Sequence, residues 1–489
     1  MKKSLALLLL AAWLLTSCGS TAQPGETDEA PDTDVAQTEA ETEKEGYDYT
    51  GIDYGGHNFQ IINMDNIYSM HTLITREEIN GEVLNDALYT RNAFVEENMN
   101  IKITELVTPA DNYFAPLLDT IRTAVTAGDN TYDMAFVPPT MGADVLTGSY
   151  LHNLKDIGCI DLSSPWYNQS YNDTLTVYGT LPAGMSSASI MLYDSFWVLF
   201  FNEDMITDRG MEMPYDLVRE GKWTFDKLHE YCLTAASLGG DESYAWNKDG
   251  SAVYGMSIKD DSPYKFMVGL GAAMVKNENG EIRMTADTEA FSNALDTCVE
   301  LLSFADGAAY LGANSDMDAD KGGYIYAFTA ERALFLTAEV CKSQNFRELE
   351  FTYGLLPFPK NDETQQNYTT SAYNNAFVFG FPVSCSDVEM SAKIMDAISY
   401  ESMVQVVPEY IDSVVEHKGL RNEESVEMLE IAMQNTHIDI GLTFGFGKDL
   451  HSAINGEVKN KTGSGASLIA AQKTAIETGI ASLAESWGK

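Results

Sequence analysis

The stretch Asp133-Met134-Ala135-Phe136-Val137-Pro138-Pro139 decides the fold class, because four consecutive apolar residues end at a pair of prolines. A short apolar run bounded by turn residues is typical of a strand that is buried on both faces, as in a parallel sheet. Upstream of it, the pattern predicts strands over 59–64 and 101–104 and helices over 83–97 and 117–125, the second of them ended by Gly128. Strands and helices that alternate in this way predict a βαβ series, and therefore a parallel sheet covered by helices.

Further elements of both kinds follow in the rest of the chain. Apolar runs predict strands over 198–201, 333–336 and 377–379, and helical spacing predicts helices over 225–231, 291–302, 390–398 and 476–487. Thr224 is the expected N-cap of the helix that follows it. Ser386 and Glu389 have the spacing of a capping box. The chain is therefore expected to be α/β, and no repeat with a period of 20 to 50 residues is present.

Length and charge narrow the classes of function. The 489 residues exceed one ordinary domain, and the 45% of hydrophobic residues suffice for sizeable cores. Asp and Glu number 73 against 30 Lys and Arg, which gives a net charge of −43. Such a surface repels phosphate backbones, so nucleic acid is excluded as an expected partner. It also argues against a polyanionic ligand unless a local basic pocket exists.

The N-terminus resembles the signal of a bacterial lipoprotein. Lys2 and Lys3 precede an apolar run over 5–15, and small residues then lead to Cys18. The signal implies that residues 1–17 are removed and that Cys18 receives a lipid, whereas an ordinary secretory signal with an incidental Cys18 is the alternative. Residues 19–46 are acidic and lack aromatic side chains, so they are expected to form a disordered tether. No later run is apolar enough to span a bilayer, so the protein is expected to be anchored to the membrane.

The remaining five cysteines argue against a disulfide framework. Their number is odd, and no two are separated by two residues, as many zinc sites require. They are Cys159, Cys232, Cys298, Cys341 and Cys385. Single buried thiols are the expectation, with one bridge left open. Acidic residues at 316, 318 and 320 suggest a calcium loop, but Lys321 stands where such a loop needs glycine, so a solvated loop is expected instead.

The order of several motifs resembles the extracellular solute-binding proteins of ABC importers, in particular the carbohydrate-type group. The resemblance runs from Phe59 to the C-terminus, and its motifs lie over 127–136, 148–154, 201–224 and 328–357. Glu331 and Arg332 depart from the Gly-Lys pair that the family has there. The family implies two α/β lobes joined by crossing strands, with the ligand in the cleft between them. On this basis the first lobe is expected over 47–185 and 376–440, and the second over 186–375 and 441–489.

Candidate ligand residues follow from the chemistry of sugars. Sugar rings stack on aromatic faces, and their hydroxyls meet carboxylate, amide and hydroxyl groups. Residues of these types stand at the strand ends and crossings that the resemblance implies: Asp65, Thr140, Trp166, Asp194, Trp197, Glu339, Tyr373 and Asn374. Glu339 lies where the family often has a Gly-Pro-Trp loop, and that tryptophan is missing here. Trp223 is expected in the core, and Trp246 is a weaker candidate.

These features together predict a lipid-anchored, monomeric receptor on the extracytoplasmic face of a bacterial membrane. It is expected to capture a carbohydrate, more specifically an oligosaccharide, and to deliver it to the transmembrane subunits of a permease. The expected protein is no enzyme and needs neither cofactor nor metal. A receptor for peptides or polyamines is the alternative within the same class. A surface glycan hydrolase is the alternative enzyme, because paired carboxylates can always be found among 73 acids.

Overall fold

The structure, a computed structural model, describes residues 46–65, 70–259, 261–302, 307, 309–311, 324–415 and 423–488. Residues 51–489 form one compact unit, which is described below, and residues 1–50 belong to another. The signal sequence, Cys18, nearly all of the acidic tether and the loop with acids at 316–320 lie outside the described residues.

The first sheet contains the βαβ series that the sequence predicts. Its order is β13-β4-β1-β2, with β1 (His57–Met64), β2 (Ile101–Thr108), β4 (Met134–Val137) and β13 (Val378–Gly380). β1 runs parallel to β2 and β4, and β13 runs antiparallel to β4. β4 occupies the predicted residues and is buried at all four. β2 continues to Thr108 instead of ending at residue 104, because it stays paired with β1 along the whole of that strand.

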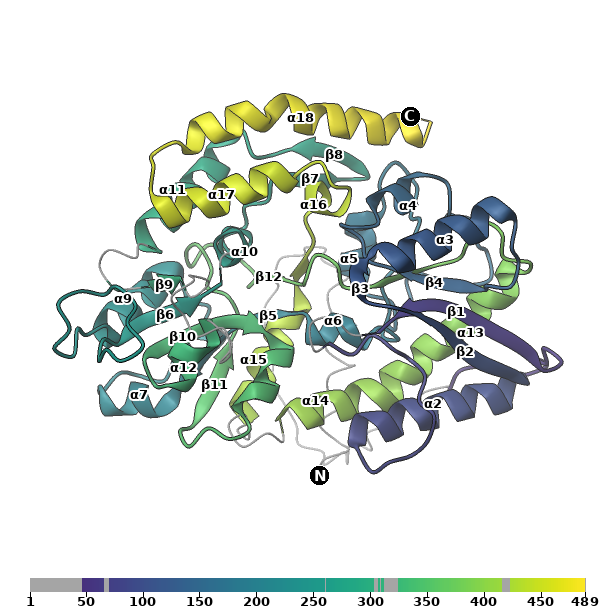
Figure 1. Cartoon of the computed structure of the whole chain (residues 1–489), viewed down its shortest axis with the longest axis horizontal. Helices are drawn as coiled ribbons and strands as arrows, with labels where there is room; N and C mark the ends of the chain where they lie inside the picture. The colour runs from purple at the N-terminus through teal and green to yellow at the C-terminus, as the bar shows by residue number, and fades with distance from the viewer. Residues whose placement is uncertain are drawn as a thin grey trace, which may run out of the picture. The chain divides into compact units, whose positions relative to one another are not determined.

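Helices cover both faces of this sheet. α3 (Ala115–Ala127) lies on one face, and α2 (Val83–Met99) and α13 (Val388–Glu401) lie on the other (Figure 1). α3 ends as predicted at Gly128, which adopts a φ of 66° and donates its N–H to the carbonyls of Ala124 and Val125. The short strand β3 (Asp111–Phe114) leads directly into α3.

The predicted capping box at Ser386 is wrong by one residue. The N-cap of α13 is Asp387, whose carboxylate accepts the backbone N–H of Met390 at 2.9 Å. Serine and aspartate are both good N-caps, so their types alone do not decide between adjacent positions. The prediction for Thr224 is confirmed: it caps α9 (Phe225–Ala235) and accepts the N–H of Lys227.

The second sheet has the order β11-β5-β10-β6-β9. Its strands are β5 (Trp197–Asn202), β6 (Tyr254–Ile258), β9 (Ala309–Leu311), β10 (Ala333–Glu339) and β11 (Tyr353–Leu356). β10 runs parallel to β6 but antiparallel to β5, which in turn is antiparallel to β11. The end of β10 therefore lies beside the end of β6 and the beginning of β5. At that edge Trp197 is paired with Glu339.

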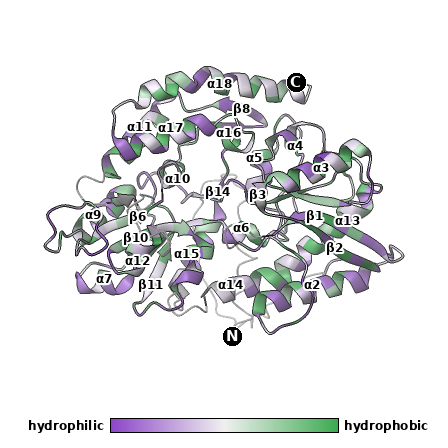
Figure 2. Cartoon of the chain, viewed as in Figure 1, coloured by the Kyte–Doolittle hydropathy of each residue, from purple (hydrophilic) through white to green (hydrophobic). Residues whose placement is uncertain are grey.

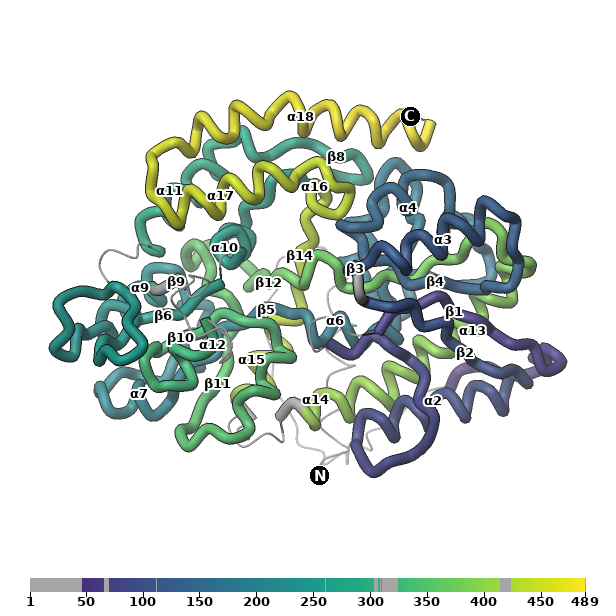
Figure 3. Tube along the Cα trace, viewed as in Figure 1, coloured from purple at the N-terminus to yellow at the C-terminus, as the bar shows by residue number. Residues whose placement is uncertain are grey.

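Short elements lead the chain from one sheet to the other. α6 (Ile190–Asp194) comes directly before β5, and β12 (Thr370–Ser371) lies between β11 and β13. β12 pairs in parallel with β14 (Thr436–His437), so two crossing segments lie side by side, and the tube in Figure 3 follows them. α14 (Val407–Val415) packs against α2, whereas α15 (Glu423–Gln434) packs against β11. The lobe boundaries stay a proposal, and the contacts of α15 favour a boundary before this helix.

The C-terminal helices pack on a hairpin and on helices that follow β6 in the chain. The hairpin consists of β7 (Val275–Glu278) and β8 (Glu281–Met284). α17 (Lys448–Asn460) and α18 (Gly465–Ser486) contact each other, and both contact α11 (Glu289–Leu301). α18 also contacts β8. α18 is amphipathic: it buries Ile469, Ile476 and Leu483 and carries both hydrophobic and hydrophilic residues in Figure 2. The remaining helices are α4 (Ala143–Thr147), η1 (Leu154–Asp156), α5 (Gln169–Leu175), α7 (Glu203–Asp208), α8 (Tyr215–Arg219), α10 (Ser262–Gly269), α12 (Tyr324–Thr329), η3 (Val340–Phe346), η4 (Ser402–Val406) and α16 (Ile440–Thr443).

The core confirms the prediction for Trp223 and, for three of the five cysteines, the expectation of buried thiols. Trp223 is fully buried, its Nε1 donates to the carbonyl of Pro357 at 3.2 Å, and its ring packs near Phe335. The five cysteines in the described part of the chain are free thiols, three of them buried and Cys159 and Cys385 partly exposed. Among the described helices, none is long and apolar enough to cross a bilayer.

Candidate functional site

Polar side chains gather at the edge of the second sheet where β6 and β10 end and β5 begins. Glu339 closes β10 and is 4% exposed, and Trp197 opens β5 and is fully buried. Lys259 follows β6 directly. Its Nζ lies 3.9 Å from Glu339 Oε1 and 3.9 Å from Asp261 Oδ2. Ligands of open α/β sheets bind where parallel strands end, so this edge is the first candidate for a binding site.

Lys265 joins this group from α10. The helix is buried at each of its positions, and Lys265 is 2% exposed. Its Nζ lies over the ring of Trp197, 4.5 Å from the ring centre. Burial lowers the pKa of Lys265, the nearby carboxylates of Asp261 and Glu339 counteract this effect, and Lys259 adds to it.

Polar groups stand at the corresponding edge of the first sheet. Thr140 follows β4, and its hydroxyl donates to the carbonyl of Asn374 at 2.9 Å. The side-chain oxygen of Asn375 accepts the N–H of Met141 at 3.0 Å. The backbone N–H of Tyr373 donates to the carbonyl of Ser195 at 3.0 Å. The segment 373–375 therefore connects the end of β4 with the residues just before β5.

The structure brings Thr140, Tyr373 and Asn374 together at this connection, with Trp197 and Glu339 at the sheet edge just beyond it. Ser195 lies two residues before Trp197, and Trp197 is paired with Glu339. Tyr373 and Asn374 are partly exposed, so their side chains are accessible at this junction. Aromatic, amide, carboxylate and ammonium groups in one region can stack on a sugar ring and bind its hydroxyls.

Asp194 lies next to this region, and its carboxylate already accepts three hydrogen bonds. Its Oδ2 accepts the backbone N–H of His71 and the ring Nδ1 of the same residue, the latter at 2.8 Å. Its Oδ1 accepts the hydroxyl of Tyr410 at 2.8 Å. The residue is 1% exposed. This arrangement ties the segment after β1 to α6 and α14 and supports a structural role for the carboxylate.

Two further candidates stand on segments other than 373–375. The indole of Trp166 packs edge-on against Tyr400 of α13, and its Nε1 donates to Asp396 at 2.6 Å. Asp65 follows β1 and is exposed. A ligand contact stays a prediction for both residues. Trp246, the weaker candidate, packs against Tyr254 at the beginning of β6, which is the opposite edge from Glu339.

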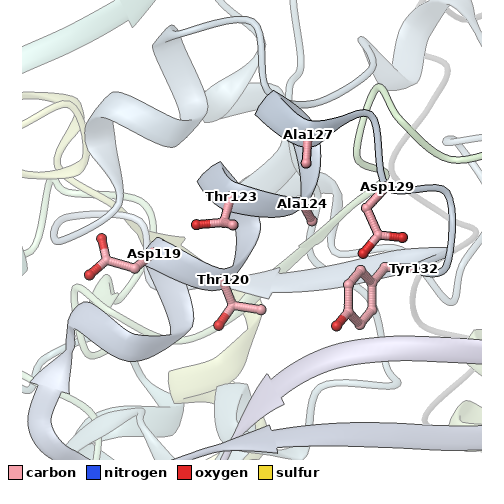
Figure 4. A pocket seen from close by; sticks show the side chains of 7 residues that line it. All are labelled: Asp119, Thr120, Thr123, Ala124, Ala127, Asp129 and Tyr132. Atoms are coloured by element: carbon pink, nitrogen blue, oxygen red, sulfur yellow. The ribbon is translucent and has the colours of Figure 1, made fainter.

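Two hollows of the surface lie elsewhere. One of about 280 Å³ runs along α3 and the loop after it, where it is lined by Asp119, Thr120, Thr123, Ala124, Ala127, Asp129 and Tyr132 (Figure 4). Asp129 is engaged there by the hydroxyl and N–H of Thr131. Another hollow lies between α7 and α8 and includes Glu203 and Arg219. None of the candidate ligand residues lines either hollow. Within the described residues, no three His, Cys, Asp or Glu side chains are grouped as metal ligands would be.

Sequence reasoning missed Lys259, Asp261 and Lys265. A signal for one of them was present, because Lys265 stands in the run Tyr264-Lys265-Phe266-Met267-Val268, where a lysine among large apolar residues indicates either a pairing or a ligand role. Lys259 and Asp261 could be recognised only after β6 was assigned, since their position just after the strand gives them their meaning.

No protein-family model matches the chain, and no curated protein matches it in sequence. Solved structures do resemble it. A cyclo/maltodextrin-binding protein in complex with maltotetraose has a TM-score of 0.59 at 12% identity, over 87% of this chain and 97% of that chain. A cyclic α-maltosyl-1,6-maltose binding protein from Arthrobacter globiformis has a TM-score of 0.56 at 14% identity, over 87% and 99%. An ABC substrate-binding protein from Listeria monocytogenes in complex with cycloalternan has a TM-score of 0.51 at 14% identity, over 89% and 99%.

These likenesses extend over almost the full length of the compared proteins, and the identities are low enough that they show the fold alone. The protein has the two-lobed α/β fold of these binding proteins.

Proposed function

We propose that the protein is the substrate-binding lipoprotein of an ABC importer and that it captures a carbohydrate, in particular an oligosaccharide, for the permease. The observation that carries this proposal is the fold match over 97% or more of three proteins that bind oligosaccharides. The grouping of aromatic, amide, carboxylate and ammonium side chains near the crossing segments supports it. The protein acts as a monomer and makes or breaks no bond, so it requires no cofactor.

The ligand site lies where the polar edges of the two sheets are connected by residues 373–375. We assign stacking to Tyr373, and hydrogen bonding to Asn374 and Glu339. Capture proceeds by an equilibrium between open and closed arrangements of the lobes, in which the ligand stabilises the closed state that the permease recognises. Trp166 and Asp65 stay candidates for contacts with further units of a longer ligand.

Thermal unfolding of the full chain tests the ligand class. The protein is purified in a detergent without a sugar headgroup and is heated with neutral oligosaccharides, trialanine or spermidine. A ligand at a hundred times its dissociation constant should add about 2.7 kcal/mol to the free energy of unfolding. Stabilisation by neutral oligosaccharides alone is the expected result. Stabilisation by trialanine or spermidine alone would replace the sugar with the alternative ligand class, and release of reducing sugar during incubation would indicate a hydrolase.

The membrane anchor is a separate part of the proposal. The sequence around Cys18 supports lipidation there, with residues 19–46 as the tether. We expect the wild-type protein in a bacterial host to sediment with membranes and the Cys18→Ala variant to be largely released from them. Equal membrane association of the two proteins would contradict an anchor at Cys18.

A further inference from the structure

Three buried polar atoms at the edge of the second sheet lack a hydrogen-bond partner among the described residues. They are Trp197 Nε1, Asp261 Oδ1 and Glu339 Oε2. The Lys265 ammonium, on a side chain that is almost fully buried, lies over the ring of Trp197, 4.5 Å from the ring centre. Burying an unsatisfied polar atom costs about 1–3 kcal/mol, and native proteins seldom leave several of them together. Three of the twelve such atoms in the described residues gather at this edge, so a molecule bound there would supply partners to all three.

The charges of this group cancel. Lys259 and Lys265 contribute two ammonium groups, and Asp261 and Glu339 contribute two carboxylates, with Lys259 Nζ 3.9 Å from an oxygen of each. Lys265 is held over the ring of Trp197 rather than in contact with a carboxylate. The carboxylates keep one oxygen each for another donor, and Lys265 keeps its protons for another acceptor. The cluster thus offers donors and acceptors in about equal measure without a net charge.

We propose that Trp197, Asp261, Lys265 and Glu339 form a subsite that encloses one uncharged sugar unit, in which Lys265 determines specificity. This inference rests on the proposed function and names the ligand class of its site. Lys265 Nζ donates to a sugar hydroxyl oxygen, and the free carboxylate oxygens of Asp261 and Glu339 accept from hydroxyl groups. Trp197 positions Lys265 through its ring. Because the unpartnered atoms are shielded from water, the ligand reaches them in an open state and is enclosed with them on closure.

Other ligand classes fit this group less well. A polyamine would satisfy the carboxylates but would bring its ammonium groups next to Lys259 and Lys265. An acidic sugar would satisfy Lys265 but would place its carboxylate among those of Asp261 and Glu339. Either arrangement buries like charges close together in a region of low dielectric, where their repulsion is strong. A hydroxyl group both donates and accepts, so a neutral sugar satisfies both kinds of atom at once.

Calorimetric titration of full-chain variants tests the subsite. The ligands are maltotriose, cellotriose and xylotriose as neutral probes, trigalacturonate as an acidic probe, and spermidine and trialanine as charged controls. Lys265→Met keeps the length of the side chain and removes the donor, and Glu339→Gln removes one negative charge. Lys222→Met is the matched control, because its side chain is 51% exposed and paired only at the surface with Glu220.

We expect at least one neutral trisaccharide to bind the wild type, and Lys265→Met to weaken it tenfold or more. Lys222→Met should bind as the wild type does. Glu339→Gln should weaken the neutral sugar and shift the preference towards trigalacturonate. Without ligand, Lys265→Met should melt at the same or a higher temperature than the wild type, because the cost of burying an ammonium group is removed. That result would separate a ligand role from a structural one.

The results that would contradict this inference differ from those that would contradict the proposed function. Neutral trisaccharides that bind Lys265→Met and Glu339→Gln as tightly as the wild type would overturn the subsite and leave the sugar-binding function in place. Preference of the wild type for trigalacturonate would overturn the uncharged ligand while keeping a carbohydrate. Binding of spermidine or trialanine in place of every neutral trisaccharide would overturn both.

Discussion

Replacing Asp194 tests whether its carboxylate stabilises the fold or binds the ligand. In the structure, Asp194 is 1% exposed and accepts hydrogen bonds from the His71 backbone, the His71 ring and the Tyr410 hydroxyl. Asp194→Ala leaves the Tyr410 hydroxyl and the His71 N–H without their acceptor, whereas the partly exposed His71 ring can turn to water. Two lost hydrogen bonds to a charged group, at about 1.5–2 kcal/mol each, predict a destabilisation of about 3–4 kcal/mol.

Equilibrium unfolding in guanidinium chloride measures this difference. Tyr410→Phe removes one donor and leaves the carboxylate with its two bonds to His71, so it should cost about 1.5–2 kcal/mol, roughly half as much. Asp208→Ala, at an exposed position at the end of α7, is the matched control and should change stability by no more than about 0.5 kcal/mol. Sugar affinity of Asp194→Ala, measured well below its melting temperature, should stay within threefold of the wild type. An Asp194→Ala protein as stable as the wild type but without sugar binding would refute the reasoning and show that Asp194 is a ligand residue.

Two further predictions concern pH and packing. Burial alone would lower the pKa of His71, but the hydrogen bond and charge of Asp194 raise it above its usual value. The stabilisation from this pair is thus fully present below about pH 6.5 and is lost as the pH rises through the higher folded-state pKa. The difference in free energy of unfolding between the wild type and His71→Asn should therefore be larger at pH 5.5 than at pH 8.5. A difference that does not depend on pH would contradict the pairing. Gly479→Ala would place its Cβ 2.4 Å from Phe446 Cβ and should destabilise the protein by about 1–3 kcal/mol. Gly456→Ala is also helical but has no neighbour within 4 Å, so it should stabilise the protein by up to about 1 kcal/mol. Equal melting temperatures of the two variants would contradict this packing.

The strand and helix patterns predicted much of the fold because local forces dominate there. Four apolar residues before two prolines located β4 to the residue, and Gly128 ended α3 because a left-handed turn favours glycine. The N-cap of α13 was displaced by one residue, since Ser386 and Asp387 are both good N-caps and their types do not decide between adjacent positions. β2 was predicted too short because its polar end is held by pairing with β1, which a local pattern does not record.

The candidate site was less predictable, because it depends on how distant segments meet. The antiparallel pairing of β5 with β10 places Trp197 beside Glu339, although 142 positions separate them in the sequence. Lys265 becomes informative only when it is found over the ring of Trp197. Asp194 has the side chain of a ligand residue, but the structure surrounds it with donors from two other segments. The residue types suit sugar chemistry, but only tertiary contacts separate ligand-binding from structural uses of them.

We propose that the protein binds a neutral oligosaccharide without altering it. A calorimetric titration of the full chain with maltotriose, cellotriose and xylotriose, followed by chromatography of the recovered sugars, tests both binding and the absence of hydrolysis. We expect saturable binding of at least one of them, with one ligand per chain, and recovery of the intact trisaccharide after prolonged incubation. Failure of all three to bind, or recovery of shortened products, would contradict it.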